Sequence, residues 1–185
     1  MSQIDIFEAT SCKPEYVAAV NRLLLQLCSS PCEMSAEQLQ NLVNEPNSRL
    51  LLLTVDSEVM GMCTVGFYTS PTGRKAWIED VVVDAQCRGL HLGERLVASA
   101  VSFAEREGFN TLMLTSRPSR VAANRLYQKV GFERKETNVY LKVKSPSPTL
   151  PVGEGLVSKS SERLKKAQKG LVRLKRKKKQ QYYET

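Results

Sequence analysis

The segment Ile78-Glu79-Asp80-Val81-Val82-Val83-Asp84-Ala85-Gln86-Cys87-Arg88-Gly89-Leu90-His91-Leu92-Gly93-Glu94 decides how the rest of the chain is interpreted. It begins with β-branched residues typical of a strand, passes a polar turn that contains Gly89, and continues into a helical pattern. A strand, a glycine loop and a helix in this order aim unpaired backbone N–H groups and the positive end of the helix dipole at one point. The segment therefore predicts a site for a phosphate-bearing cofactor.

The segments on either side predict an α/β domain with a mixed sheet. Strands are expected at 4–8, 49–55, 59–68, 76–83, 111–115 and 137–143, with a further short one near residue 132, and helices at 14–28, 35–44, 92–107 and 120–130. Asp56-Ser57-Glu58 is expected as a hairpin turn. Ser35 followed by Gln38 predicts a capping box for the second helix, and Gly108 is expected to close the third. The helix between 76–83 and 111–115 makes this pair parallel, whereas the earlier strands are antiparallel. Alternation along 76–83 predicts that Trp77, Glu79 and Val81 share one face and Ile78, Asp80 and Val82 the other.

Charge divides the chain into a neutral part and a basic tail. Residues 1–144 hold 16 lysines and arginines against 16 acidic residues, whereas residues 145–185 hold 11 against 3. We expect a domain at 1–144, a Pro/Gly/Ser linker at 145–158 and a partly helical or disordered tail at 159–185. The tail has three interpretations: a solvated extension, a nuclear-import or nucleic-acid contact through the basic run 175–179, or a membrane-surface helix.

Cysteine usage and hydropathy argue against a metal-binding, a disulfide-stabilised or a membrane-spanning protein. The five cysteines form no C-x-x-C pair and only one histidine accompanies them, so neither a metal site nor a disulfide framework is expected. No apolar run approaches the roughly 20 residues of a membrane-spanning helix, and the first residues lack a signal pattern. These features predict an intracellular, cytoplasmic protein, or a nuclear one if the basic run is an import signal.

Two sequence motifs indicate which family of phosphate-binding proteins the chain resembles. Only Gly89 and Gly93 are present, so the dinucleotide fingerprint fails, and no Gly-Lys-Ser/Thr follows as a nucleotide P-loop requires. The segment Gln86-Cys87-Arg88-Gly89-Leu90-His91-Leu92-Gly93 resembles the acetyl-CoA loop, Q/R-x-x-G-x-G/A, of the GNAT superfamily of N-acetyltransferases. A second block, Ala123-Asn124-Arg125-Leu126-Tyr127-Gln128-Lys129-Val130-Gly131-Phe132, is similar to that family's A-x-x-L-Y-x-x-x-G-F helix and turn. The resemblance spans nearly all of residues 1–143 and implies a GNAT fold.

The resemblance also implies site residues. Tyr127 matches the family tyrosine that protonates the CoA sulfur; the alternative is an aromatic side chain that only packs. Glu79 is the candidate base. The alternatives are that Asp80 is the base, or that Glu79 only forms an ion pair with an arginine. The cofactor-binding set implied is Val81, Val82, Val83, Gln86, Arg88, Gly89, Leu90, His91, Leu92, Gly93, Arg120 and Asn124. Two departures from the family stand out: His91 replaces a glycine or alanine, and Arg120 replaces an asparagine, so Arg120 is expected to pair with a CoA phosphate.

The expected activity is acetyl transfer from acetyl-CoA to a primary amine by direct attack in a ternary complex, without a metal. A small-molecule acceptor is favoured. The resemblance implies that the connection at 28–34 and the last strands choose the acceptor. One alternative is a protein-lysine or N-terminal acetyltransferase that docks its basic tail on nucleic acid or acidic proteins. Another is a non-catalytic acyl-CoA-binding or interaction module. Dimers are common for the fold, so a homodimer is also an expectation.

Overall fold

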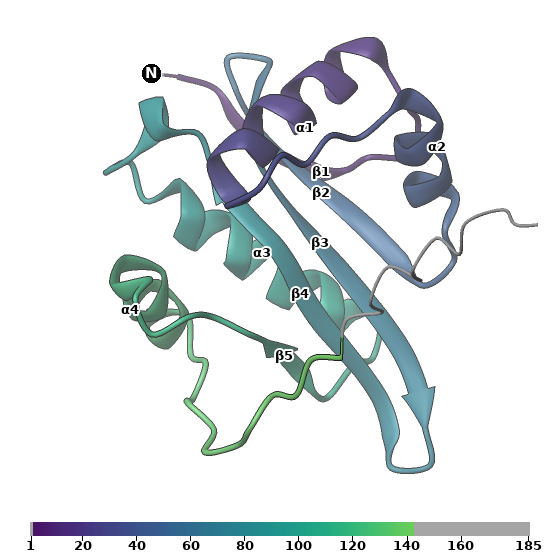
Figure 1. Cartoon of the computed structure of the whole chain (residues 1–185), viewed down its shortest axis with the longest axis vertical. Helices are drawn as coiled ribbons and strands as arrows, with labels where there is room; N and C mark the ends of the chain where they lie inside the picture. The colour runs from purple at the N-terminus through teal and green to yellow at the C-terminus, as the bar shows by residue number, and fades with distance from the viewer. Residues whose placement is uncertain (1, 143–185) are drawn as a thin grey trace, which may run out of the picture. The chain divides into compact units, whose positions relative to one another are not determined.

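The computed structural model describes residues 2–142. In this part of the chain, five strands form one sheet in the order β1-β2-β3-β4-β5, antiparallel throughout except for the parallel pair β4 and β5 (Figure 1). The elements are β1 (Ile4–Glu8), α1 (Pro14–Leu27), α2 (Ala36–Asn44), β2 (Ser48–Val55), β3 (Glu58–Ser70), β4 (Gly73–Val83), the 3₁₀ turn η1 (Ala85–Cys87), α3 (Leu92–Arg106), β5 (Leu112–Leu114) and α4 (Val121–Lys129). All of them lie within Met1–Glu136, which forms one compact unit. The predicted mixed α/β sheet is confirmed.

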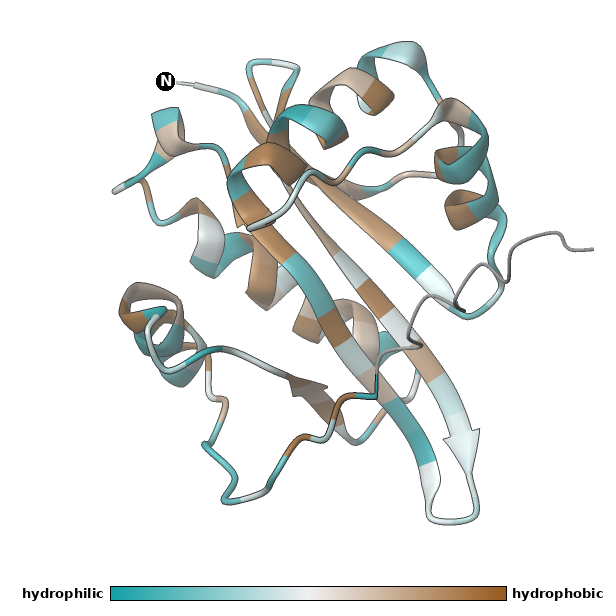
Figure 2. Ribbon diagram, viewed as in Figure 1, coloured by the Kyte–Doolittle hydropathy of each residue, from teal (hydrophilic) through white to brown (hydrophobic). Residues whose placement is uncertain are grey.

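Each face of the sheet packs against its own helices, because apolar residues alternate along the strands (Figure 2). On β2, Leu50 and Leu52 face α1 and α2, whereas Leu51 and Leu53 face α3. The helices contribute one apolar stripe each to these cores. The fully buried members include Leu23, Leu39 and Leu52 on the first face and Leu92, Leu96 and Val97 on the second.

Local signals in the sequence set the helix ends. Ser35 and Gln38 form the predicted capping box at the start of α2: the Gln38 N–H donates to Ser35 Oγ at 3.1 Å, and the Ser35 N–H donates to Gln38 Oε1 at 2.7 Å. At the end of α3, Gly108 has φ +75°, the left-handed conformation that glycine adopts without strain. Both predictions are confirmed.

A β-bulge in β4 corrects the predicted alternation. Glu79 pairs with Thr64 and Val82 pairs with Met62, so Asp80 and Val81 together oppose Cys63, and Asp80 has φ +55°. Ile78 packs in the core beneath α3, whereas Val82 packs in the core beneath α1 and α2, and Val81 contacts the α3 side. The prediction that Ile78 and Val82 share a face is therefore wrong, because an extra residue in one strand reverses the side of every residue after it.

Two further predictions about strands are corrected. The β2–β3 turn has two residues rather than three: Asp56 and Ser57 have φ of 49° and 71°, and Glu58 already belongs to β3. The strand expected at 137–143 is absent over residues 137–142, and no short strand forms at residue 132. Val139, Tyr140 and Leu141 are exposed, so the apolar alternation that favoured a strand has no packing surface there.

Part of the sequence-based organisation falls outside the described residues. The predicted linker and basic tail, at 145–185, are among these, and the domain boundaries at 144 and 158 stay predictions. Within residues 2–142, none of the helices combines the length and the apolar character that crossing a bilayer requires.

Candidate active site

The two parallel strands at the centre of the predicted site pair over only three residues. Ala76–Ile78 of β4 pair with Leu112–Leu114 of β5, where β5 ends, but β4 continues to Val83. Among the described residues, β4 beyond Ile78 therefore has a strand partner on its β3 side alone. The three valines predicted to hold the cofactor, Val81, Val82 and Val83, lie in this unshared stretch. Their backbone groups on the β5 side are available to a ligand because no neighbouring strand uses them.

The loop after β4 is fixed at its start by Asp84. This side chain is only 3% exposed, and its Oδ1 accepts the Gln86 N–H at 3.0 Å as the N-cap of η1. Its Oδ2 accepts the Gln26 side-chain amide at 3.2 Å and pairs with the Arg22 guanidinium. The Gln86 N–H, the Gln26 amide and the Arg22 charge hold the pKa of Asp84 below its usual value, although burial opposes them.

The loop then enters α3 through two residues in the left-handed conformation. Gly89 has φ +80°, and His91, the N-cap of α3, has φ +55°. No side chain caps this helix, because the His91 ring contacts Glu94 Oε1 at 2.9 Å instead. The first-turn amides of a helix have no acceptor within it, so those of Leu92 and Gly93 suit an anion.

The His91 side chain lies at the surface of the loop and does not pack in the core. Its side chain is 71% exposed, and its partner Glu94 also binds Lys129 of α4, with 2.6 Å between Glu94 Oε2 and Lys129 Nζ. Lys129 first, and His91 second, hold the pKa of Glu94 below its usual value. These contacts connect the first turn of α3 to α4, the helix that carries Tyr127.

Tyr127 lies at the edge of the core on the α3 side of the sheet. It is 9% exposed, and its ring packs edge-on against Phe132 with centroids 6.3 Å apart. Burial raises its pKa, an effect that the Arg120 charge opposes. The phenol thus stays protonated at neutral pH and can donate a proton. The packing that sequence analysis set against a catalytic role is present together with this chemistry.

Glu79 and Asp80 are both exposed, on β4 where its pairing with β5 ends. Partial burial, followed by the neighbouring Asp80 charge, raises the pKa of Glu79. The alternative that Glu79 pairs with an arginine is not observed within residues 2–142, where it forms no ion pair. A carboxylate with a raised pKa and an open side is suited to accept a proton.

The remaining predicted residues surround this region in different ways. Arg120 donates from Nη2 to the Leu27 carbonyl at 3.1 Å, at the C-terminal end of α1, where the helix dipole favours a cation. Asn124 donates to the Arg117 and Arg120 carbonyls at 2.9 and 3.0 Å and so closes the loop before α4. Gln86, Arg88 and Leu90 belong to the loop itself, with Leu90 59% exposed at its tip. The phosphate contact of Arg120 and the cofactor contact of Asn124 stay predictions.

Two of the five cysteines, Cys63 and Cys87, are buried. Burial raises the pKa of the Cys63 thiol to about 12. A thiol that remains protonated at neutral pH is a poor nucleophile, so neither fits a covalent acetyl-cysteine route. Within residues 2–142, no group of three or more histidine, cysteine or acidic side chains is arranged to hold a metal ion.

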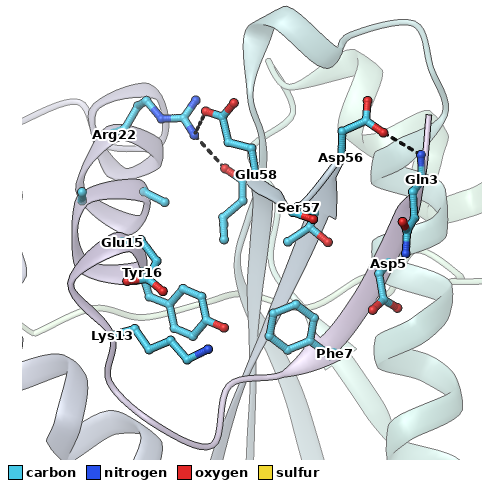
Figure 3. A pocket seen from close by; sticks show the side chains of 14 residues that line it. Gln3, Asp5, Phe7, Lys13, Glu15, Tyr16, Arg22, Asp56, Ser57 and Glu58 are labelled. Atoms are coloured by element: carbon cyan, nitrogen blue, oxygen red, sulfur yellow. Dashed lines mark hydrogen bonds and ion pairs between the residues drawn. The ribbon is translucent and has the colours of Figure 1, made fainter.

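A groove of about 810 Å³ lies elsewhere, between α1 and the β1–β2 end of the sheet (Figure 3). Phe7 and Tyr16 face each other across it, with ring centroids 6.2 Å apart, and Lys13 lies over the Tyr16 ring. Arg22 reaches its rim and pairs with Glu58 at 3.3 Å. None of the predicted site residues lines this groove.

Three residues that organise the loop were missed by sequence reasoning: Arg22, Gln26 and Asp84. The sequence alone assigns no role to any of them, because their contacts join α1 to the loop across about 60 residues of sequence. The one local signal was Asp84 directly after a strand, a common place for a turn-capping side chain.

Within residues 2–142, a strand edge without a parallel neighbour lies next to a helix N-terminus without a side-chain cap, which is a geometry suited to a phosphate-bearing ligand. Comparison with known proteins gives the family: residues 17–132, more than half of the chain, match the model of the Acetyltransferase (GNAT) family. The chain therefore belongs to this family and is an acetyl-CoA-dependent acyltransferase. The resemblance inferred from the two motifs is confirmed.

Individual relatives agree with this assignment. The chain is 29% identical over 147 residues to glucosamine 6-phosphate N-acetyltransferase 1 of Oryza sativa subsp. japonica, covering 72% of this chain and 87% of the relative. It superposes with a TM-score of 0.66 and 18% identity on an aminoglycoside acetyltransferase from an uncultured soil metagenomic sample, covering 76% and 97%. It superposes with a TM-score of 0.64 and 14% identity on an aminoglycoside N-acetyltransferase solved with CoA, covering 78% and 97%. The two structural matches establish the fold.

We predict that His91→Gly stabilises the fold. The left-handed backbone at His91 costs a residue with a Cβ about 1 kcal/mol, and the exposed pair with Glu94 returns little of it. Unfolding in urea should show a gain of about 0.5–1 kcal/mol for His91→Gly. The control His91→Ala keeps the strain and loses the pair, so it should be no more stable than the wild type. Equal stability of the two variants would contradict this account.

We predict that Asp84→Asn weakens the fold at neutral pH and flattens its acid dependence. The lowered pKa of Asp84 means that its contribution is fully present above the ordinary value of about 3.9 and is lost as pH falls through the folded-state pKa. The variant should lose about 1–3 kcal/mol at pH 7 and differ less from the wild type at pH 3. Denaturant unfolding at both pH values measures this, and a constant difference would contradict the assignment.

Proposed function

We propose that this acyltransferase moves the acetyl group of acetyl-CoA to a primary amine of a small molecule by direct attack in a ternary complex. The acetyl-CoA thioester supplies the activated acyl group. The amides of Gly89–Gly93 hold the pyrophosphate, whereas the Arg88 N–H, also expected to do so, donates to the Ala85 carbonyl at 3.3 Å. The backbone of Val81–Val83 holds the pantetheine arm and polarises the thioester carbonyl. Three features fit this cofactor: the left-handed backbone at Gly89 and His91, the N-terminus of α3 without a side-chain cap, and the edge of β4 beyond Ile78 that has no pairing with β5.

One geometric relation carries the proposal. Glu79 follows Ile78 in regular alternation, so it projects toward the face that α1 and α2 cover, whereas Tyr127 projects from α4 on the α3 side. Groups on opposite faces of a continuous sheet cannot meet. The end of β4–β5 pairing at Ile78 removes this barrier, so a ligand between the strands can touch both.

The two side chains then divide the proton chemistry. Glu79 accepts a proton from the incoming ammonium, which generates the neutral amine that attacks. Tyr127 donates a proton to the departing thiolate. A carboxylate with a raised pKa and a phenol that stays protonated have the ionisation states that these roles need at pH 7.

The names of the relatives favour a small acceptor. The rice relative is named for glucosamine 6-phosphate, and the soil relative for aminoglycosides. A protein-lysine or N-terminal acceptor stays the alternative, because the basic tail that would dock such a substrate lies outside the described residues. Cytoplasmic or nuclear location, a homodimer and nucleic-acid contact likewise stay predictions.

Release of free thiol from acetyl-CoA tests the reaction class. We expect turnover with at least one member of a panel of amino sugars, polyamines and other primary amines, and little with lysine peptides. Turnover with peptides alone would favour the protein-acetylating alternative. CoA binding without turnover on any acceptor would favour a non-catalytic module.

We predict that Tyr127→Phe lowers kcat about 100-fold, because general-acid catalysis contributes roughly that much. The phenol must be protonated to donate, so wild-type activity should decline as pH rises toward its raised pKa. The variant should show no such decline. Tyr68→Phe, on the exposed part of β3, is the matched control and should behave as the wild type. An unchanged kcat for Tyr127→Phe across pH would exclude the acid role.

We predict that Glu79→Gln removes the acid limb of the kcat/KM profile. The carboxylate accepts a proton only when ionised, and its raised pKa places the limb above the ordinary glutamate value of about 4.3. The loss at pH 7 should be about 100-fold. Asp80→Asn distinguishes the neighbouring carboxylate: if this variant loses the limb and Glu79→Gln keeps it, Asp80 is the base.

A further inference from the structure

The last turn of α1 forms hydrogen bonds with the first residues of the loop between β4 and α3, residues 84–91, which is called the cofactor loop below. Gln26 donates from Nε2 to Asp84 Oδ2 at 3.2 Å and accepts the Ala85 N–H on Oε1 at 2.9 Å. One amide side chain therefore satisfies two consecutive loop residues. The contact is specific for glutamine, because it needs a donor and an acceptor on one planar group.

Asp84 makes further contacts that fix the start of the loop relative to α1. It is buried, and it caps η1 through the Gln86 N–H while it pairs with Arg22, one turn before Gln26 on α1. Hydrogen bonds to an ionised, buried carboxylate are stronger than neutral ones and leave little freedom of movement. The loop thus begins from a fixed point on α1, five residues before Gly89.

The connection between α1 and α2 depends on the same helix. Asn21 of α1 binds Met34 twice: its Nδ2 donates to the Met34 carbonyl at 2.9 Å, and its Oδ1 accepts the Met34 N–H at 2.8 Å. At the other end, Cys28 directly follows α1 and donates its N–H to the Leu24 carbonyl at 2.9 Å. Residues 28–34 are therefore held at both ends by α1.

A third segment reaches the same turn. Arg120, the N-cap of α4, donates to the carbonyl of Leu27, the residue next to Gln26. The last turn of α1 consequently contacts the start of the cofactor loop, the start of the helix that carries Tyr127, and the start of the connection 28–34. A displacement of the loop must be transmitted to this turn or break the Gln26 contacts.

We propose that Gln26 is a positioning residue that couples CoA binding in the loop after β4 to the conformation of the connection 28–34. The inference rests on the proposed cofactor site, but it adds a role for α1 that the cofactor site does not require. Gln26 contacts neither the predicted pyrophosphate amides nor Glu79 and Tyr127. It acts through Asp84 and Ala85.

The test uses the full chain with CoA alone as the ligand. We would measure the Kd of CoA by calorimetry and the hydrogen exchange of peptides covering 28–34 and 84–93, with and without CoA. The variants are Gln26→Leu, which keeps the size but loses both contacts, and the control Gln40→Leu, at an exposed glutamine of α2. Gln26→Leu removes a hydrogen bond to the buried Asp84 and should lower the thermal midpoint, so binding and exchange are compared at a temperature where both variants are fully folded.

In the wild type and in Gln40→Leu, we expect CoA to slow exchange at both 84–93 and 28–34. In Gln26→Leu, the start of the loop is no longer fixed before CoA binds, so part of the binding free energy must order it. The Kd should rise about tenfold, and the protection of 28–34 should disappear. CoA binding that protects 84–93 but leaves 28–34 unchanged in the wild type would overturn the coupling alone. Identical behaviour of Gln26→Leu and the wild type would overturn the role of Gln26. Absence of CoA binding in the wild type would overturn the cofactor site and the coupling together.

Discussion

The bulge at Asp80 is the constraint on which the site depends. Two residues of β4 oppose Cys63 of β3, so the strand changes the face of its side chains in the middle of the sheet. Before the bulge, β4 pairs with β5 and closes the sheet; after it, β4 has only β3 as a partner within residues 2–142. The bulge thus lies next to the stretch of β4 that, among the described residues, has no strand partner on its β5 side. A regular β4 would keep Glu79 and Val81 on one face.

The sequence was sufficient for features that local chemistry determines. The capping box of Ser35 and Gln38, the left-handed Gly108 and the strand–loop–helix around Gly89 were predicted at the right positions, because each depends on residues close in sequence. The mixed sheet followed from the order of elements. The family followed from two motifs whose order and separation match it. These are the levels at which short-range physics and spacing carry most of the information.

Features set by distant contacts were not predictable. The bulge at Asp80 depends on registry with β3, and a residue with φ +55° that is not glycine gives no sequence signal of it. Gln26 and Arg22 meet Asp84 only because α1 packs across β3 and β4. The expected strand at 137–143 failed over residues 137–142 for the opposite reason: its apolar alternation is real, but Tyr140 and Leu141 have no surface to bury against. Pattern alone cannot supply a packing partner.

A crystal structure of the full chain with CoA tests the central claim most directly, because the claim concerns one place in the sheet. The account predicts that the pyrophosphate accepts hydrogen bonds from the amides of Gly89–Gly93. It also predicts that the pantetheine arm enters between β4 and β5 along Val81–Val83, with its sulfur between Glu79 and Tyr127. CoA bound in the groove beside Phe7 and Tyr16, or a sulfur remote from Tyr127, would contradict it.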